Sequence, residues 1–213
     1  MEPIMKANKN GYRLEIFQDE APDSPRNWDN LGKMICFGKH GLGDKHDYKD
    51  HFEFFLSLAE EILGDADEAE KRFNSSDWQE IAEFVENSGE YIMLPLYLYD
   101  HSGLTMQTYP YPCPWDSGLA GWIYVDRSRL PEEQMTAEQA TKYLQGEVKT
   151  YNQYLTGDVY GYVLEQPETC PYCKHVENVH VDSCWGLFGL DGLKEQILGY
   201  LGSEFGELVE ALA

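Results

Sequence analysis

Side chains that could bind a metal ion lie close together late in the chain. Cys170 and Cys173 form a C-x-x-C pair, and His175 and His180 follow it. Zinc binds four sulfur or nitrogen ligands in a tetrahedron, and a C-x-x-C pair lets two thiolates from a single turn share one ion. Cys184 is an alternative fourth ligand, although it is further along an expected strand and can also pack as a small apolar residue. The pattern predicts a structural zinc ion, since four protein ligands leave no open position.

Two other interpretations of these cysteines are open. Five cysteines without a secretion signal are typical of free thiols in the cytoplasm rather than of a disulfide framework. The segment Cys170-Pro171-Tyr172-Cys173 also resembles a glutaredoxin-type redox motif. That motif opens a helix near the N-terminus of a thioredoxin fold, whereas this segment comes after most of the chain and beside histidines. We therefore expect a metal site.

A thiol, an imidazole and a carboxylate in two other segments could form a small hydrolase site. Cys113 would be the nucleophile, His101 the base and Asp116 the group that orients the base. The segments that contain them, 100–103 and 113–118, are also typical of turns in which Asp and Ser bond their own backbone. No G-x-S-x-G, P-loop, G-x-G-x-x-G or H-E-x-x-H motif accompanies them. The sequence favours turns here, and a protein without catalytic residues.

Charge is the most unusual property of the composition. The 213 residues include 38 Asp and Glu against 16 Lys and Arg, a formal net charge of −22. Such a surface repels phosphate groups and attracts basic protein surfaces, so we expect a basic protein partner and no direct binding of nucleic acid. Solubility alone is the competing explanation. The segment 51–90 carries 12 acidic and 2 basic residues, so its net charge of −10 is nearly half of the total.

Apolar periodicity and turn residues predict the elements that position these groups. Helices and strands in mixed order, with hairpins, indicate an α+β fold with a mainly antiparallel sheet. We expect one domain over 1–213, with an acidic helical insertion over 51–90 and a zinc-binding hairpin tip over 168–181. The expected helices cover 52–63, begin at Ser76 and at Thr136 with capping-box spacing, and close the chain over 193–212. The expected strands are an N-terminal pair over 12–17 and 31–37, followed by 91–99, 104–109, 121–125, 158–165 and 180–187.

Several distinctive stretches are spread over most of the chain. They are LYDHSG at 98–103, CPWDSG at 113–118, YLTGDVYG at 154–161 and DSCWG at 182–186, together with Asp29-Asn30-Leu31-Gly32. As a set they resemble the signature stretches of a family of small acidic proteins from bacteriophages and other mobile elements. That family has no assigned enzyme activity, so the resemblance implies no catalytic residue. It implies a mobile-element context, and the chain is similar in kind to anti-CRISPR inhibitors of type II nucleases.

Charge and context together lead to a functional hypothesis. We expect an acidic inhibitor in the cytoplasm of a bacterial host, most concretely an anti-CRISPR protein that binds a basic surface of a Cas nuclease and blocks nucleic-acid loading. A Cys/His-dependent hydrolase and a structural or regulatory phage protein are the alternatives. We expect no signal peptide, no membrane span, and a monomer or weak dimer. The expected contact residues are Glu60, Glu61, Asp65, Asp67, Glu68, Glu70, Glu80 and Glu83.

Overall fold

The computed structural model describes residues 2–213, and their contacts divide the chain into two compact units. One unit is Arg26–Asn152, and the other joins the chain through Pro25 to the chain from Gln153 onward. Helices and antiparallel strands confirm the expected α+β class. The sequence predicted one domain over 1–213, whereas each unit of the structure forms its own sheet and its own apolar core.

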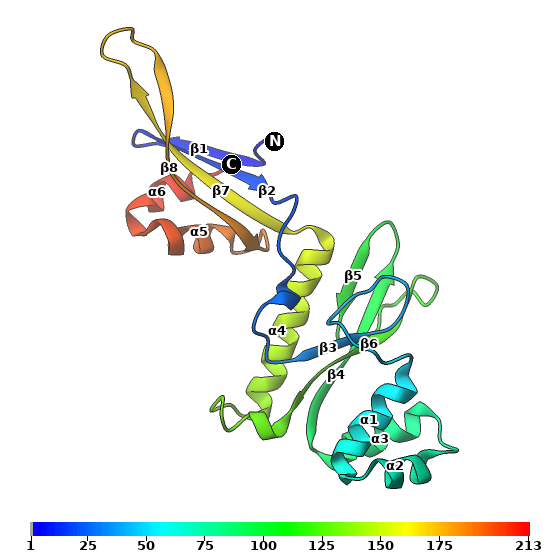
Figure 1. Ribbon diagram of the computed structural model, residues 1–213. Helices are drawn as coiled ribbons and strands as arrows, with labels where there is room; N and C mark the ends of the chain where they lie inside the picture. The colour runs from blue at the N-terminus through cyan, green and yellow to red at the C-terminus, as the bar shows by residue number, and fades with distance from the viewer. Residues whose placement is uncertain (1) are drawn as a thin grey trace. The chain divides into compact units, whose positions relative to one another are not determined.

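The unit formed by the two ends of the chain is a four-stranded sheet with helices on one face (Figure 1). Its elements are β1 (Met5–Lys9), β2 (Tyr12–Gln18), β7 (Val159–Thr169), β8 (Val176–Phe188), α5 (Leu193–Leu201) and α6 (Gly206–Glu210). The strands are antiparallel in the order β1-β2-β7-β8. The core combines Leu14 and Ile16 of β2 and Tyr162 of β7 with Ile197 and Leu208 of the two helices.

The unit Arg26–Asn152 contains the second sheet, in the order β3-β6-β4-β5. Its strands are β3 (Lys33–Cys36), β4 (Tyr91–Asp100), β5 (Leu104–Gln107) and β6 (Ser117–Asp126). The predicted N-terminal strand pair is wrong, because β2 bonds to β1 and β7 whereas β3 bonds to β6. The polar loop between β2 and β3 therefore carries the chain from one sheet to the other.

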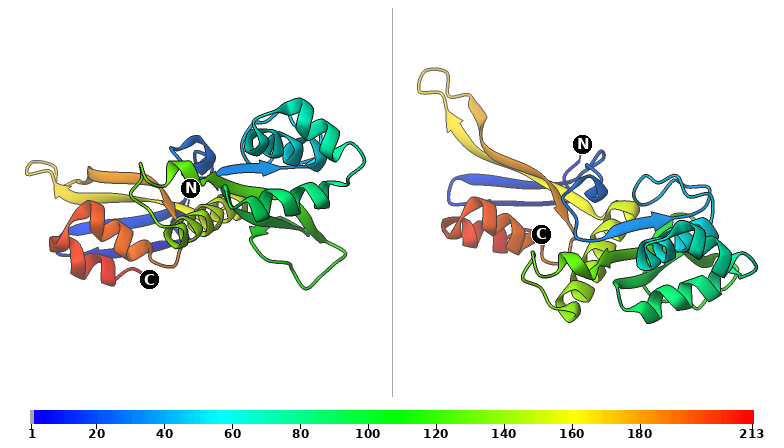
Figure 2. Two further views of the ribbon diagram at one scale, coloured as in Figure 1. Left: turned by 90° about the horizontal axis from the view of Figure 1, so that it is seen from below. Right: turned by 60° about the horizontal axis from the view of Figure 1, so that its bottom comes forward.

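Three helices pack as one layer on this second sheet (Figures 1 and 2). They are α1 (His51–Leu63), α2 (Ala66–Phe73) and α3 (Trp78–Ser88). Phe54 and Phe55 of α1 and Ile81 of α3 form one apolar cluster with Trp122 of β6. We call this region, residues 51–90, the acidic helical layer.

Each helix of the acidic helical layer begins at an aspartate. The side chains of Asp50, Asp65 and Asp77 accept hydrogen bonds from the backbone amides of Glu53, Glu68 and Glu80, at 3.0, 3.1 and 3.0 Å. A carboxylate at this position satisfies an amide that has no partner inside the helix and complements the helix dipole. The N-cap of α3 is therefore Asp77, one residue after the Ser76 that the sequence predicted. The short helix α2 was not predicted, because it buries only two side chains.

The other helices agree with the sequence at their starts more than at their ends. The capping box predicted for α4 (Ala137–Thr156) is confirmed: the Thr136 amide donates to Gln139 Oε1 at 2.8 Å, and the Gln139 amide donates to Thr136 Oγ1 at 3.2 Å. The single closing helix predicted over 193–212 is wrong, because α5 ends at Leu201. Gly202 then adopts φ 96° and ψ 162°, a non-helical conformation that glycine tolerates, before the chain resumes in α6.

Gly121 of β6 lies directly against the backbone of β3. A Cβ atom at this position would lie 1.9 Å from the Ile35 carbonyl oxygen and 2.9 Å from Cys36 Cα, so the two strands would have to separate. We predict that Gly121→Ala lowers the free energy of unfolding by roughly 2–3 kcal/mol, measured by denaturant titration. Gly118→Ala is the matched control, because a Cβ atom there meets nothing within 4 Å on the same strand. Equal losses in the two variants would contradict the steric explanation.

Candidate functional site

The acidic helical layer presents most of its carboxylates to solvent, because its apolar side chains face the sheet. Of the predicted contact residues, Glu61, Asp65, Asp67, Glu68, Glu70, Glu80 and Glu83 are exposed and Glu60 is half-buried. The layer contains two basic side chains, Lys71 and Arg72, and the Arg72 guanidinium lies over the Phe84 ring at 4.4 Å from its centroid. The result is a nearly continuous acidic surface.

Glu61 is already engaged within this unit. The Tyr91 hydroxyl donates a hydrogen bond to the Glu61 carboxylate. Burial, and then this bond to a negative group, raise the pKa of the Tyr91 hydroxyl. A partner that binds Glu61 must compete with Tyr91, so Asp67, Glu70 and Glu83 are the better candidates for contact.

The tip between β7 and β8 brings two of the predicted zinc ligands together. The Cys170 amide donates to the His175 carbonyl at 2.7 Å, and the Lys174 amide donates to the Cys170 carbonyl at 3.0 Å, which closes a tight turn. The backbone amides of Cys173 and Tyr172, and then the Cys173 thiol, hydrogen-bond the Cys170 sulfur and lower the pKa of its thiol. The two sulfurs are therefore neighbours.

The other two predicted ligands lie further down β8. His180 is opposite Glu165 and Cys184 is opposite Tyr162 in the β7–β8 register. Strand residues advance by about 3.3 Å each, which puts His180 roughly 16 Å along the strand from His175. His180 Nε2 instead lies 3.1 Å from Ser183 Oγ. Among residues 2–213, no three His, Cys, Asp or Glu side chains are grouped as a metal ion requires, and zinc stays a prediction.

The predicted hydrolase residues meet at one carboxylate. His101 Nδ1 lies 3.4 Å from Asp116 Oδ2, and Cys113 Sγ lies 3.7 Å from the same oxygen. Asp116 thus stands between the thiol and the imidazole, whereas a triad needs the imidazole between the thiol and the carboxylate. The Asp100 amide also donates to the Asp116 carbonyl at 2.8 Å. The geometry is that of a hydrogen-bonded corner where β4 ends and β6 begins.

A hollow of about 370 Å³ adjoins this corner, and sequence reasoning missed one of its ion pairs. The Asp100 carboxylate lies 3.0 Å from His40 Nε2 and 3.2 Å from Lys39 Nζ. The hydrogen bond from His40, and then that from Lys39, lower the pKa of Asp100. Trp115 also lines the hollow and is 91% exposed. Nothing in the local spacing of residues 39–40 and 100 signals this contact, because they come from different elements.

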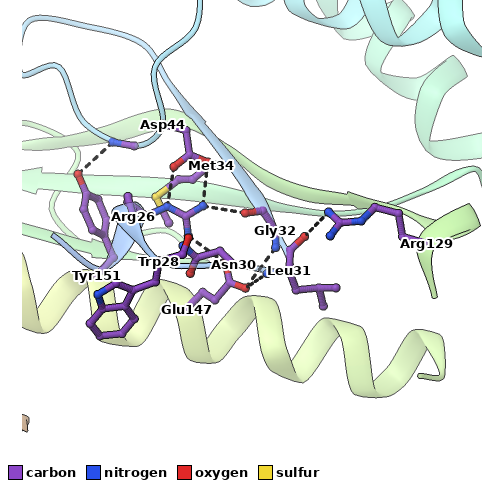
Figure 3. A network of polar contacts seen from close by, with 11 residues as sticks. Arg26, Trp28, Asn30, Leu31, Gly32, Met34, Asp44, Arg129, Glu147 and Tyr151 are labelled. Carbon is purple, nitrogen blue, oxygen red and sulfur yellow. Dashed lines mark hydrogen bonds and ion pairs between the residues drawn. The ribbon is translucent and has the colours of Figure 1, made fainter. Parts of the chain in front are cut away.

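Sequence reasoning also missed a buried ionic network around Arg26 (Figure 3). The Arg26 guanidinium donates two hydrogen bonds to Asp44, both at 2.8 Å, and one to Glu147 at 2.9 Å. A fourth bond reaches the Gly32 carbonyl at 2.7 Å. Burial by itself lowers the pKa of the guanidinium, but the bonds to the two carboxylates outweigh burial and raise it. Arg26 is therefore fully charged in the interior of this unit.

The two carboxylates of this network have further partners. Glu147 Oε1 accepts the amides of Leu31 and Gly32 at 2.8 and 3.2 Å, and Asp44 Oδ2 accepts the Met34 amide at 2.8 Å. These bonds attach the start of β3 to α4 and to the loop after β3. Their role is positioning, because each partner belongs to the fold itself.

Comparison of the chain with protein-family models, with curated proteins and with solved structures finds no match to any of them. The resemblance to acidic mobile-element proteins therefore stays a prediction. Among residues 2–213, no helix combines the length and the apolar character that crossing a membrane requires.

The cysteines differ in their thiol pKa, which predicts the order of their alkylation. Burial, and then the Asp44 carboxylate, raise the pKa of Cys36 to about 12, whereas the pKa of Cys170 is lowered. Because the thiolate is the reactive form, iodoacetamide at neutral pH should modify Cys170 well before Cys36. Peptide mass spectrometry over a time course measures both rates. In denaturant the difference should disappear, and equal rates in the folded protein would contradict the assignment.

The buried network predicts a large cost for removing one of its members. The side chains of Arg26 and Glu147 are only 5% and 14% exposed, so Glu147→Ala leaves a buried charge without one partner. We expect a loss of roughly 3 kcal/mol in the free energy of unfolding. The control is Glu138→Ala on the same helix, where an exposed pair with Lys142 should contribute about 0.5 kcal/mol or less. Denaturant titrations that gave the same small loss for both would refute a structural role of the network.

Proposed function

We propose that this protein is an acidic inhibitor of a nucleic-acid-targeting defence complex, most concretely an anti-CRISPR protein that binds a Cas nuclease. In this proposal the acidic helical layer occupies Lys and Arg side chains that otherwise hold guide or target strands. Loading of nucleic acid is then blocked by competition for one basic surface. The site of action is the cytoplasm of a bacterial host.

The observation that carries the proposal is the uneven distribution of charge within Arg26–Asn152. This unit contains 23 acidic and 11 basic residues, a net charge of −12. The acidic helical layer accounts for 12 of the acidic and 2 of the basic residues, which leaves 11 and 9 for the rest. Solubility requires net charge but does not require it on one layer. A concentrated acidic surface is what recognition of a basic groove needs.

The rigidity of the layer also supports binding. Its helices are capped by aspartates and packed on the sheet through Phe54, Phe55 and Ile81, all fully buried. The exposed carboxylates are therefore held on a preformed surface, and binding does not require the chain to become ordered. The same packing leaves the two basic side chains of the layer outnumbered on its outer surface.

The hydrolase alternative has weaker support. His101 and Cys113 both approach Asp116, and the imidazole is not between the other two groups. Without that arrangement the imidazole cannot take the proton of the thiol directly.

A second part of the proposal concerns the tip between β7 and β8. We propose that it binds a structural zinc ion with Cys170 and Cys173 as two of the ligands. The support is the C-x-x-C spacing together with the contact between the two sulfurs.

Charge reversal on the acidic helical layer tests the inhibitor proposal. We predict that Asp67→Lys, Glu70→Lys and Glu83→Lys together slow association with a purified type II Cas nuclease by roughly tenfold to a hundredfold at low salt. The reason is loss of electrostatic steering, so added salt should reduce the difference between the variant and the unchanged protein. Association rates measured by surface plasmon resonance over a salt series give both quantities.

The matched control changes the net charge by the same amount elsewhere. Glu195→Lys, Glu204→Lys and Glu210→Lys alter exposed residues of the other unit and should leave association nearly unchanged. A loss in this control alone would move the binding face to α5 and α6. Tight binding to bare DNA or RNA, or an affinity indifferent to salt and to both sets of reversals, would overturn the proposal. Cleavage assays in which the protein is added before or after guide and target then separate blocked loading from blocked cleavage.

A further inference from the structure

We propose that the tip between β7 and β8 is half of a zinc site and that a second copy of this chain supplies the other half. One zinc ion, bound by Cys170 and Cys173 of each copy, would join two chains tip to tip. The inference rests on the proposal that the tip binds zinc, and it is independent of the proposed inhibitor function.

The tip lies at the end of a two-stranded extension of the sheet. The last pair between β2 and β7 joins Arg13 to Glu165, and beyond it residues 166–169 pair with 176–179 of β8. We call residues 166–179 the hairpin arm, which extends beyond the rest of its sheet in Figures 1 and 2. Its four residue pairs span roughly 13 Å. The two thiols are thus carried away from the body of their own unit.

The hairpin arm is exposed along its whole length. Every residue of the arm is exposed except Cys170, which is half-buried. A two-stranded hairpin without packing on a core is only marginally stable in water. A metal ion that cross-links the tip would supply stability that the core of the unit does not give to the arm.

The number of ligands at one tip points to a shared site. A structural zinc ion takes four protein ligands, and one tip provides two neighbouring sulfurs. Among residues 2–213, no third His, Cys, Asp or Glu side chain forms a metal-binding group with them. His180 lies opposite Glu165, at the base of the arm. A two-fold axis through the ion would bring two identical tips together and complete a tetrahedron of four sulfurs.

The charges of the two copies allow this contact. Four thiols release four protons to bind one Zn²⁺ ion, so the complete site has a charge of −2, and Lys174 of each copy lies beside it in sequence. Two arms placed tip to tip hold the bodies of their sheets roughly 25 Å apart. That separation exceeds the Debye length of about 8 Å at physiological salt, so repulsion between the two acidic bodies is largely screened.

Zinc chloride titrated into the metal-free, reduced, full-length protein tests this inference. Size-exclusion chromatography with light scattering should show conversion from monomer to dimer, complete at one zinc ion per two chains. EDTA should return the dimer to monomer. Co²⁺ in place of zinc should give the intense thiolate-to-metal absorption of a site with four sulfur ligands.

Variants assign the ligands and separate the possible failures. The double variant Cys170→Ser with Cys173→Ser should keep its circular dichroism spectrum, because the tip is exposed, and should stay monomeric at every zinc concentration. Cys113→Ser and His180→Ala, as controls, should dimerise like the unchanged protein. A monomer with one zinc ion per chain would overturn the sharing but keep zinc at the tip, and absence of zinc uptake would overturn both. A dimer that persists in the double variant would contradict the metal bridge, and none of these results bears on the inhibitor.

Discussion

The Arg26 guanidinium holds together parts of Arg26–Asn152 that share no strand or helix. It bonds the loop after β3 through Asp44, the helix α4 through Glu147, and the start of β3 through the Gly32 carbonyl. Without the cation, two carboxylates would face each other in a largely buried site, where repulsion and desolvation both oppose folding. The position of β3 beside β6, and with it one edge of the sheet under the acidic helical layer, depends on this network.

The surplus of carboxylates is compatible with folding because the structure uses them in three different places. Asp44 and Glu147 pair with a buried cation, and Asp50, Asp65 and Asp77 cap helices where the dipole favours a negative charge. The rest are mostly solvated and spaced over helices, where salt screens their repulsion. The carboxylates without a structural role are gathered on one layer, which is why we connect that layer with binding.

Both groups of residues that suggested chemistry lie where strands end. The turn between β7 and β8 presents two neighbouring thiols to solvent, and the corner between β4 and β6 joins a thiol and an imidazole through one carboxylate. The exposed arm is suited to contact with another molecule, because nothing in its own unit covers it. The corner is suited to holding two strand ends in register, since backbone bonds such as that from Asp100 to Asp116 accompany it.

The sequence by itself determined the features that depend on neighbouring residues: the apolar stripe of α1, the Thr136–Gln139 capping box, the C-x-x-C turn and the acidic character of 51–90. Only the tertiary structure decided which strands pair, how far His180 lies from the tip, and that Arg26 meets Glu147 across 121 residues of chain. Register and burial decide these features, and both arise from contacts between segments distant in sequence. Local periodicity records the face that a residue presents, but it does not record the segment that this face will meet.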